Sequence, residues 1–225
     1  IHEVVRLMGW PVLDVPGVEA DDVIGTLAVA AARQGIDVVI SSGDKDLAQL
    51  VNEHITIIDT MSGKVRDLAG VEAEFGVPAR LMLDYQMLVG DTVDNVPGVH
   101  KVGPKTAVKL LQEYGSVDAL VARAGEIKGA VGENLRKAID WLPTSRQLLT
   151  IKTDCDLNGW VPGMPALDAI RIGAPQIAPL MAFCDTYGFK GLARTLAGDA
   201  PAAAPAPVVA MPGQNGDLFA DHSAS

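Results

Sequence analysis

Three short apolar runs and one helical repeat organise the first part of the chain. The runs at residues 12–15, 38–41 and 55–59 are rich in Val, Leu and Ile, which is typical of buried strands. Apolar side chains recur at helical spacing over residues 20–34 and Gly35 follows, which predicts a helix that ends at a glycine. Two strands joined by a helix of this length form a parallel βαβ unit. We therefore expect a parallel sheet.

The remainder of the chain has mainly helical patterns. Helices are expected over residues 1–8, 45–51, 68–75, 78–89, 104–114, 131–142, 145–150, 175–187 and 190–197. The predicted fold is α/β, with a parallel-sheet core over residues 1–89 and a helical subdomain over residues 90–198. Residues 199–225 are rich in Ala and Pro without an apolar period, so we expect them to form an extended linker tail.

The charge of the chain is distributed unevenly. The formal net charge of −10, taken alone, argues against a nucleic-acid partner. Residues 1–95 carry 6 basic and 16 acidic side chains, whereas residues 96–152 carry 9 basic and 5 acidic ones. An acidic half beside a basic segment would suit a metal-dependent nuclease, in which carboxylates hold cations and lysines hold phosphates. Ordinary solvated surface explains the same distribution and is the simpler account of charge alone.

Other features of composition narrow the class of protein. The two cysteines, Cys155 and Cys184, match neither a disulfide framework nor a zinc site, and they suit a reducing cytoplasm. The sequence has no signal-peptide pattern and no apolar run long enough to span a bilayer, so no membrane partner is expected. The chain begins at Ile1 with the end of a helical pattern, and we expect it to be a fragment of a longer protein.

Seven carboxylates fall into three clusters, two of which follow predicted strands. The clusters are Glu19, Asp21 and Asp22; Asp44 and Asp46; and Asp91 and Asp94. Open α/β sheets bind ligands at the carboxyl ends of their strands, so the first two clusters are expected at one edge. Oxygen ligands without His or Cys suit Mg²⁺ or Mn²⁺. Two such cations would support phosphodiester hydrolysis by a metal-bound water, so we predict no protein nucleophile.

Each acidic cluster also has a purely structural explanation. Acids in the first turn of the helix over residues 20–34 favour the positive end of its dipole. Asp44 would be the N-cap of the short helix that follows, and Asp91 and Asp94 would be turn residues. If Asp91 and Asp94 instead share a helical turn, their spacing points them in one direction. These alternatives stay open for each cluster, while the occurrence of three clusters together favours a metal site.

A glycine hairpin at residues 98–103 lies between two helical patterns. Glycines let the backbone approach a partner, and the N–H groups at a helix start can bind a phosphate. Lysines add attraction that does not depend on base sequence. The candidates for DNA contacts are Gly98, Val99, His100, Lys101, Val102, Gly103, Lys105, Thr106 and Lys109. A plain helix–turn–helix connection with surface lysines explains the pattern equally well.

Four motifs give the chain a family resemblance. GVEADDVIGTLA, SSGDKDLAQLV, GDTVDNVPGV and GPKTAVKLL, in this order and spacing, closely resemble the 5′-nuclease domain of bacterial DNA polymerase I, within the flap endonuclease family. The resemblance covers about residues 1–198, and the tail lies where such polymerases have a linker to the next domain. It implies a PIN-like nuclease core followed by a helix–hairpin–helix subdomain.

The resemblance also implies an activity, a set of ligands and a cellular role. The implied reaction is Mg²⁺- or Mn²⁺-dependent 5′→3′ exonuclease and flap endonuclease cleavage of branched, flapped or nicked duplex DNA in primer removal and repair. By motif, Glu19, Asp21 and Asp22 correspond to the first metal site, and Asp44, Asp46, Asp91 and Asp94 to the second. The hairpin corresponds to a duplex-binding hairpin that holds K⁺ through carbonyl oxygens. We expect a monomer in the bacterial cytoplasm, near the nucleoid. Polymerase domains are expected C-terminal to it.

Two departures from the family pattern bear on these expectations. The family's first strand with its aspartate, a second early aspartate and a basic helical arch would precede Ile1, so we expect the first metal site to be incomplete in this chain. Lys101 stands where the family hairpin usually has a glycine, and a positive φ there would cost roughly 1–2 kcal/mol. The alternatives to a nuclease are a non-catalytic module that binds DNA structure and, less well supported, an RNA-cleaving PIN-type nuclease.

Overall fold

The computed structural model describes residues 1–160 and 167–198, which form parts of two compact units. One unit joins Ile1–Val12 to the segment that starts at Ile172, and the other comprises Leu13–Arg171. The predicted linker tail over residues 199–225 lies outside the described residues. No helix among the described residues is long and apolar enough to cross a membrane. The division expected near residue 89 remains a prediction.

The first unit consists of helices from both ends of the chain. Helix α1 (His2–Leu7) packs on α9 (Ile177–Tyr187), which is followed by α10 (Lys190–Leu196). Backbone hydrogen bonds link the two ends: the Gly173 N–H donates to Gly9 O at 2.7 Å. All three helices lie where the apolar period predicts them.

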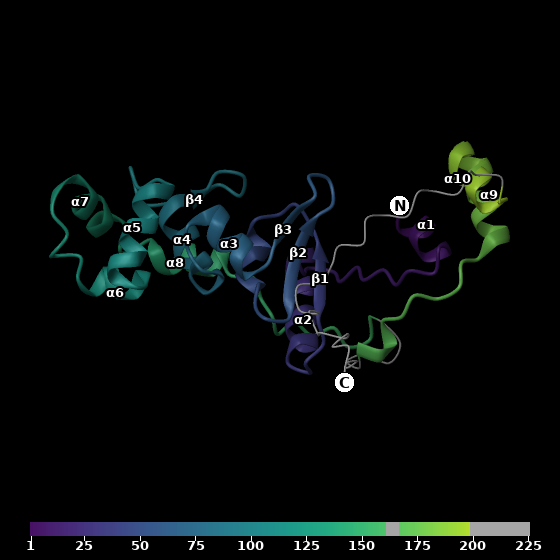
Figure 1. The fold of residues 1–225 in the computed structure, drawn as a ribbon, viewed down its shortest axis with the longest axis horizontal. Helices are drawn as coiled ribbons and strands as arrows, with labels where there is room; N and C mark the ends of the chain where they lie inside the picture. Colours follow the sequence, from purple (N-terminus) through teal and green to yellow (C-terminus); the bar gives the residue numbers. More distant parts are fainter. Residues whose placement is uncertain (161–166, 199–225) are drawn as a thin grey trace, which may run out of the picture. The chain divides into compact units, whose positions relative to one another are not determined.

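The second unit contains a three-stranded sheet in the order β1-β2-β3, visible at the centre of Figure 1. Strands β1 (Val38–Ser41) and β2 (Ile55–Asp59) are parallel, and β3 (Lys64–Arg66) is antiparallel to β2. Ile40 pairs with Ile57, and both side chains are buried. Strands β1 and β2 form from the β-branched runs that predicted strands, whereas β3 was not predicted and makes the sheet mixed instead of all parallel. The short helix η1 (Asp46–Leu50) lies in the connection between β1 and β2.

The prediction of a strand at residues 12–15 is wrong. These residues have no regular secondary structure, and the three-stranded sheet does not include them. The apolar run is buried without a strand, because Val15 packs against Val23 and Leu157 in a small separate core. The apolar run predicted burial correctly but not strand pairing. The parallel pair in the structure is therefore β1 with β2 and does not include a strand before the helix.

Helix α2 (Ala20–Ala32) follows Glu19 and presents Asp21 and Asp22 in its first turn. Asp22 is buried on this helix together with Val23, Gly25, Ala28 and Ala31. The helix ends two residues before the predicted position, and Gly35 adopts a φ of 73° just beyond it. The first acidic cluster is therefore held on a rigid helix start.

The rest of the second unit is helical, as predicted, with one small β-hairpin. Its elements are α3 (Leu68–Phe75), η2 (Ala79–Leu81), α4 (Met82–Val89), β4 (Gly90–Asp91), β5 (Val96–Pro97), α5 (Pro104–Tyr114), α6 (Val117–Ala122), α7 (Gly129–Ala138), α8 (Leu142–Leu149) and η3 (Leu167–Ala169). Several details differ from expectation: α7 ends four residues and α8 begins three residues before the helices expected over 131–142 and 145–150, and β4, β5 and η3 were not predicted. The segment expected as one helix over residues 78–89 begins with a 3₁₀ turn, and α6 is an additional helix that the Ser116 side chain caps by accepting from the Ala119 N–H.

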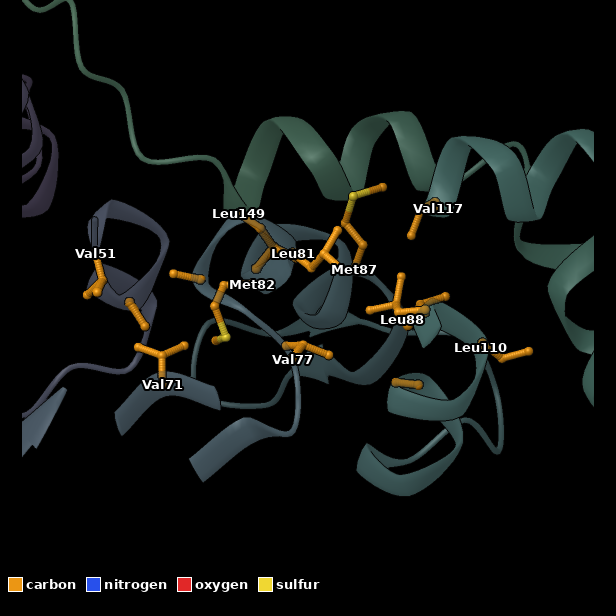
Figure 2. Close-up of a cluster of buried hydrophobic side chains, with 14 of the residues drawn as sticks. Val51, Val71, Val77, Leu81, Met82, Met87, Leu88, Leu110, Val117 and Leu149 are labelled. Carbon is orange, nitrogen blue, oxygen red and sulfur yellow. The ribbon is translucent and has the colours of Figure 1, made fainter. Parts of the chain in front are cut away.

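One continuous core joins the sheet to the helices. The cluster includes Ile40 and Ile57 of the sheet together with side chains of the helices. Figure 2 shows its helical part, where Val51 after η1 and Val71 on α3 lie in the same cluster as Leu110 on α5. Because core side chains pack closely and resist displacement, the helices are held firmly against the sheet. The loops between β1 and η1 and between β4 and β5 are thereby fixed relative to α2, and these three places carry the acidic clusters.

Candidate metal centre and hairpin

The structure brings all seven predicted carboxylates together. Six of them line one cavity of about 490 Å³, which also has Asn95, Val96 and residues 148–151 in its wall; these six are Glu19, Asp21, Asp22, Asp44, Asp46 and Asp94. The seventh, Asp91, lines an adjoining cavity of about 360 Å³ that shares Asp44, Asp46 and Asp94 with the first. Three segments far apart in the sequence therefore converge on one acidic site.

Asp46, Asp91 and Asp94 form the tightest group within that site. Each offers a carboxylate oxygen, and these oxygens all lie within 4.8 Å of one another. Asp46 begins η1, whereas Asp91 lies in β4 and is only 3% exposed. Oxygen donors at this separation suit a hard divalent cation, so this cluster of the described residues could hold a metal ion.

Lys45 places a positive charge among these carboxylates. Its ammonium group forms an ion pair with Asp91 and another with Asp46, where Nζ lies 3.3 Å from Oδ1. Burial acts to raise the pKa of Asp91, but hydrogen bonds from Lys45 and from the backbone N–H groups of Val93 and Asp94 together lower it. Asp91 is thus held in the ionised form that a metal ligand requires.

Asp21 and Asp46 have the opposite shift. Burial raises the pKa of Asp21, and the nearby carboxylates of Asp44 and Asp46 raise it further. Burial also raises the pKa of Asp46, despite the Lys45 ammonium. Both carboxylates therefore resist ionisation in the metal-free protein, as expected where like charges share a partly buried site. A bound cation would remove that penalty.

The structural explanation is wrong for Asp44 and holds for Asp91. Lys45, not Asp44, holds the N-cap position of η1, although Asp44 Oδ1 accepts a hydrogen bond from the Asp46 N–H at 2.9 Å that orders the start of this turn. Asp91 Oδ1 accepts from the Val93 N–H at 2.7 Å, which makes it a turn residue. The alternative that Asp91 and Asp94 share a helical turn is wrong, because residues 92–95 form a turn between β4 and β5. A carboxylate has two oxygens, so the turn hydrogen bond on one oxygen of Asp44 leaves its other oxygen for a cation, whereas Asp91 Oδ2 is paired with the Lys45 ammonium.

The segment after α8 closes the acidic cavity from a distant part of the chain. The Lys152 N–H donates to Asp22 Oδ1 at 2.9 Å. Close to that contact, a Cβ on Gly25 would lie 2.7 Å from Ile151 Cγ2, so only glycine lets this segment approach α2. Local sequence pattern does not predict this contact, because its partners lie 130 residues apart along the chain.

Two glutamines of the site were also missed. Gln86 lies on α4 with 2% exposure, and its Nε2 donates to Asp46 Oδ1 at 2.6 Å. Gln49 Nε2 donates in turn to Gln86 Oε1 at 2.8 Å. The available signal for Gln86 was a polar residue at a core position of an otherwise apolar helix.

The glycine hairpin is anchored at its start and at its middle. Gly98 lies against the start of β4, where a Cβ would be 2.3 Å from the Val89 carbonyl carbon. The Trp141 indole N–H donates to Pro97 O at 2.7 Å, and Asn134 Nδ2 donates to His100 O at 2.9 Å. Helices α7 and α8 therefore hold the hairpin that α5 follows.

The hairpin divides its predicted DNA contacts into buried and exposed groups. The side chains of Val99 and Val102 are buried in the core, so only their backbone could reach a partner. The remaining side chains in the predicted set are exposed or half-buried; among them are His100, Lys101, Lys105, Thr106 and Lys109. Lys101 has a φ of 61°, which confirms that this position needs the left-handed conformation that favours glycine.

Comparisons with known proteins find related sequences over most of this chain. A model of the 5′-3′ exonuclease N-terminal resolvase-like domain matches residues 1–76, and one of the 5′-3′ exonuclease C-terminal SAM fold matches residues 77–165. The DNA polymerase I of Pseudomonas aeruginosa is 44% identical over 202 residues, which cover 84% of this chain and 21% of that protein. The 5′-3′ exonuclease of Aquifex aeolicus is 42% identical over 158 residues, or 70% of this chain and 54% of that protein. The chain thus spans about a fifth to a half of the length of these relatives.

Solved structures show the same fold at low sequence identity. T5 5′-exonuclease with bound divalent metal ions (zinc) aligns with a TM-score of 0.57 and 21% identity, over 62% of this chain and 52% of that one. The catalytic core of Rad2 in complex with a DNA substrate aligns with a TM-score of 0.53 and 14% identity, over 87% of this chain and 65% of that one. At these identities the likeness concerns the fold, which is a mixed α/β core with a helical region after it.

Proposed function

Because the chain belongs to the 5′-3′ exonuclease family, we propose that it is the nuclease part of a DNA polymerase I that cleaves duplex DNA near a 5′ end. The observation that carries the proposal is the convergence of seven carboxylates on one site within the same compact unit as an anchored glycine hairpin. The substrates are branched, flapped or nicked duplexes. The wider role is primer removal and repair by a monomer in the bacterial cytoplasm, near the nucleoid.

The carboxylates would hold two Mg²⁺ or Mn²⁺ ions. Glu19, Asp21 and Asp22 belong to the first site, and Asp44, Asp46, Asp91 and Asp94 to the second. When bound, a pair of such ions supplies an activated water and stabilises charge on the phosphate oxygens. The protein's own contribution is to hold the carboxylates converged and, through Lys45 and the turn N–H groups, to keep Asp91 ionised.

The hairpin would hold the duplex on its phosphate backbone. Exposed Lys101, Lys105 and Lys109 supply positive charge, and the N-terminus of α5 supplies backbone N–H groups. Such contacts position a duplex without reading its bases, which suits an enzyme that recognises DNA structure. A K⁺ ion at the hairpin carbonyl oxygens is part of this proposal. His100 O already accepts from Asn134, so the ion would use other carbonyls or share that one.

Cleavage of a labelled 5′-flap duplex tests the proposal directly. The 225-residue chain is incubated with Mg²⁺, with Mn²⁺ and with a chelator, beside the double variant Asp44→Ala/Asp46→Ala. We expect cutting near the junction that needs the metal, and its loss by at least about 100-fold in the double variant, because two ligands of one site are gone. Duplex binding by the variant should persist, since the hairpin is unchanged.

Two outcomes would contradict the proposal in different ways. Undiminished cutting by the double variant would remove the metal assignment for Asp44 and Asp46. Flap binding by the parent chain without any metal-dependent cutting would contradict catalysis by this chain alone. Because the first metal site is expected to be incomplete here, the same assay on a chain that carries the family's first strand and its aspartate then decides: recovered cutting identifies a truncated nuclease, and continued binding without cutting favours the non-catalytic DNA-binding module.

A further inference from the structure

Gln86 is a buried polar residue beside the proposed second metal site. It lies on α4 among the fully buried side chains of Met82, Met87 and Leu88. Burying an amide without hydrogen-bond partners would cost free energy of folding. The Gln86 amide has a partner, because its Nε2 donates to Asp46 Oδ1 at 2.6 Å. The contact joins the hydrophobic core directly to one of the clustered carboxylates.

The orientation of the Gln86 amide is set by Gln49. Gln49 Nε2 donates to Leu149 O at 2.7 Å, and the Ile151 N–H donates to Gln49 Oε1 at 3.5 Å. A backbone carbonyl can only accept and a backbone N–H can only donate, so these two contacts determine which end of the Gln49 amide is which. Gln49 Nε2 also donates to Gln86 Oε1 at 2.8 Å, which turns the Gln86 NH₂ group towards Asp46.

The two donors that reach Asp46 act on the same oxygen. Gln86 Nε2 and Lys45 Nζ both contact Oδ1, at 2.6 and 3.3 Å. With Oδ1 engaged, Oδ2 is the oxygen that this arrangement leaves to a cation shared with Asp91 and Asp94. The Lys45 side chain is flexible and 42% exposed, whereas the Gln86 side chain is packed in the core. Gln86 is therefore the more rigidly held of the two donors.

We propose that Gln86 is a positioning residue for Asp46, and that Gln49 sets its direction from the backbone of residues 149–151. The inference rests on the proposed metal site and adds a connection to it. The end of α8, in the helical part of the unit, controls the carboxylate of Asp46 through two amides. Hydrogen bonds to metal-binding carboxylates from such outer partners commonly account for 10-fold or larger differences in metal affinity.

A titration of the full 225-residue chain with Mn²⁺ in the absence of DNA, monitored by electron paramagnetic resonance, measures Mn²⁺ affinity and tests this connection. The proteins are the wild type, Gln86→Met, Gln49→Met, the double variant, and Gln147→Met as a control with the same change at an exposed position on α8. We expect Gln86→Met to weaken Mn²⁺ binding about 10-fold and Gln147→Met to leave it unchanged. Met has nearly the length of Gln and suits the apolar surroundings, so the variants should fold; thermal unfolding in chelator checks this.

The double variant separates a relay from two independent effects. If Gln49 acts through Gln86, the double variant should bind Mn²⁺ no more weakly than Gln86→Met alone. Equal Mn²⁺ affinity in Gln86→Met and wild type, whatever the change in melting temperature, would overturn the positioning role. Multiplied effects in the double variant would overturn the relay. A wild-type chain that binds no Mn²⁺ would overturn both this inference and the proposed metal site, which the other two outcomes leave standing.

Discussion

Individual carboxylates in this protein serve the backbone and the acidic site together. Asp44 orders the start of η1 and Asp91 orders the turn before β5, yet both line the cavities where the other acids converge. The structural and functional explanations of an acidic residue are therefore not exclusive. Asp21 shows the cost of gathering these acids, because burial raises its pKa first and the nearby carboxylates of Asp44 and Asp46 raise it further.

Replacing Asp21 by Asn should stabilise the metal-free protein while weakening metal binding. The pKa of Asp21 is raised from its ordinary value of 3.8, which means that ionisation of this carboxyl is disfavoured in the folded state. At pH 7 the ionised carboxylate therefore lowers the stability of the wild-type fold. In chelator at pH 7 we expect Asp21→Asn to melt a few degrees higher than wild type.

The pH dependence supplies the control for that prediction. The difference in melting temperature between Asp21→Asn and wild type should shrink as the pH falls through the raised pKa of Asp21, because the wild-type carboxyl then becomes neutral. A variant that is less stable than wild type at pH 7 would show that Asp21 has a structural role instead.

Helix α2 is held by hydrogen bonds from a segment far away along the chain. The chain after α8 crosses its first turns, where the Lys152 N–H donates to Asp22 and the Cys155 N–H donates to Thr26 Oγ1 at 3.2 Å. Gly25 permits this crossing, since a Cβ there would meet Ile151 and Lys152. The first acidic cluster is thus held in place by packing between two elements that local sequence does not connect.

Gly25→Ala should destabilise the protein even though alanine is the better helix former. Alanine in a helix interior usually stabilises by about 0.5–1 kcal/mol. Here the new methyl group would push Ile151 away, and overpacking of this kind costs about 1–3 kcal/mol. Urea unfolding should place the variant's midpoint below that of wild type.

Gly191→Ala is the matched control, because Gly191 lies within α10 with open space where a Cβ would go. It should leave stability unchanged or raise it slightly. A Gly25→Ala protein that gains stability as Gly191→Ala does would show that residues 151–153 do not press against α2.

Taken together, the acidic and basic parts of the chain explain how a protein of net charge −10 could bind DNA. The carboxylates are gathered around two adjoining cavities, whereas the exposed lysines of the hairpin and α5 present positive charge elsewhere in the same unit. Net charge alone is therefore a poor guide to a nucleic-acid partner in this molecule.

Lys101→Gly should separate stability from duplex binding. Glycine accepts a φ of 61° without strain, so the free energy of unfolding should rise by about 1 kcal/mol. If the ammonium group contacts a phosphate, the slope of log K against log salt for duplex binding should fall in size by about 1. Fluorescence anisotropy over a salt series measures this slope, and urea unfolding measures the stability. An unchanged slope would remove Lys101 from the DNA contacts.

Much of this protein is predictable from local pattern. Helical periods, β-branched runs and the acidic clusters each depend on residues near in sequence, and all but one of the predicted elements lie close to their expected positions. The strand at residues 12–15 failed because an apolar run shows that side chains are buried and not what the backbone pairs with. Gln86 and Lys45 escaped prediction because their partners, Asp46 and Asp91, lie 40 and 46 residues away along the chain.

The amino-acid sequence alone determined the helices, the strands at residues 38–41 and 55–59, and the chemistry on offer: oxygen ligands for cations and a lysine-bearing hairpin. Only the tertiary structure decided that the three acidic clusters converge, which of their oxygens are already engaged, and which amides and ammonium group hold them. The physical reason is range. Periodicity and capping act within a few residues, whereas carboxylates interact through distances in space that the packing of one continuous core sets.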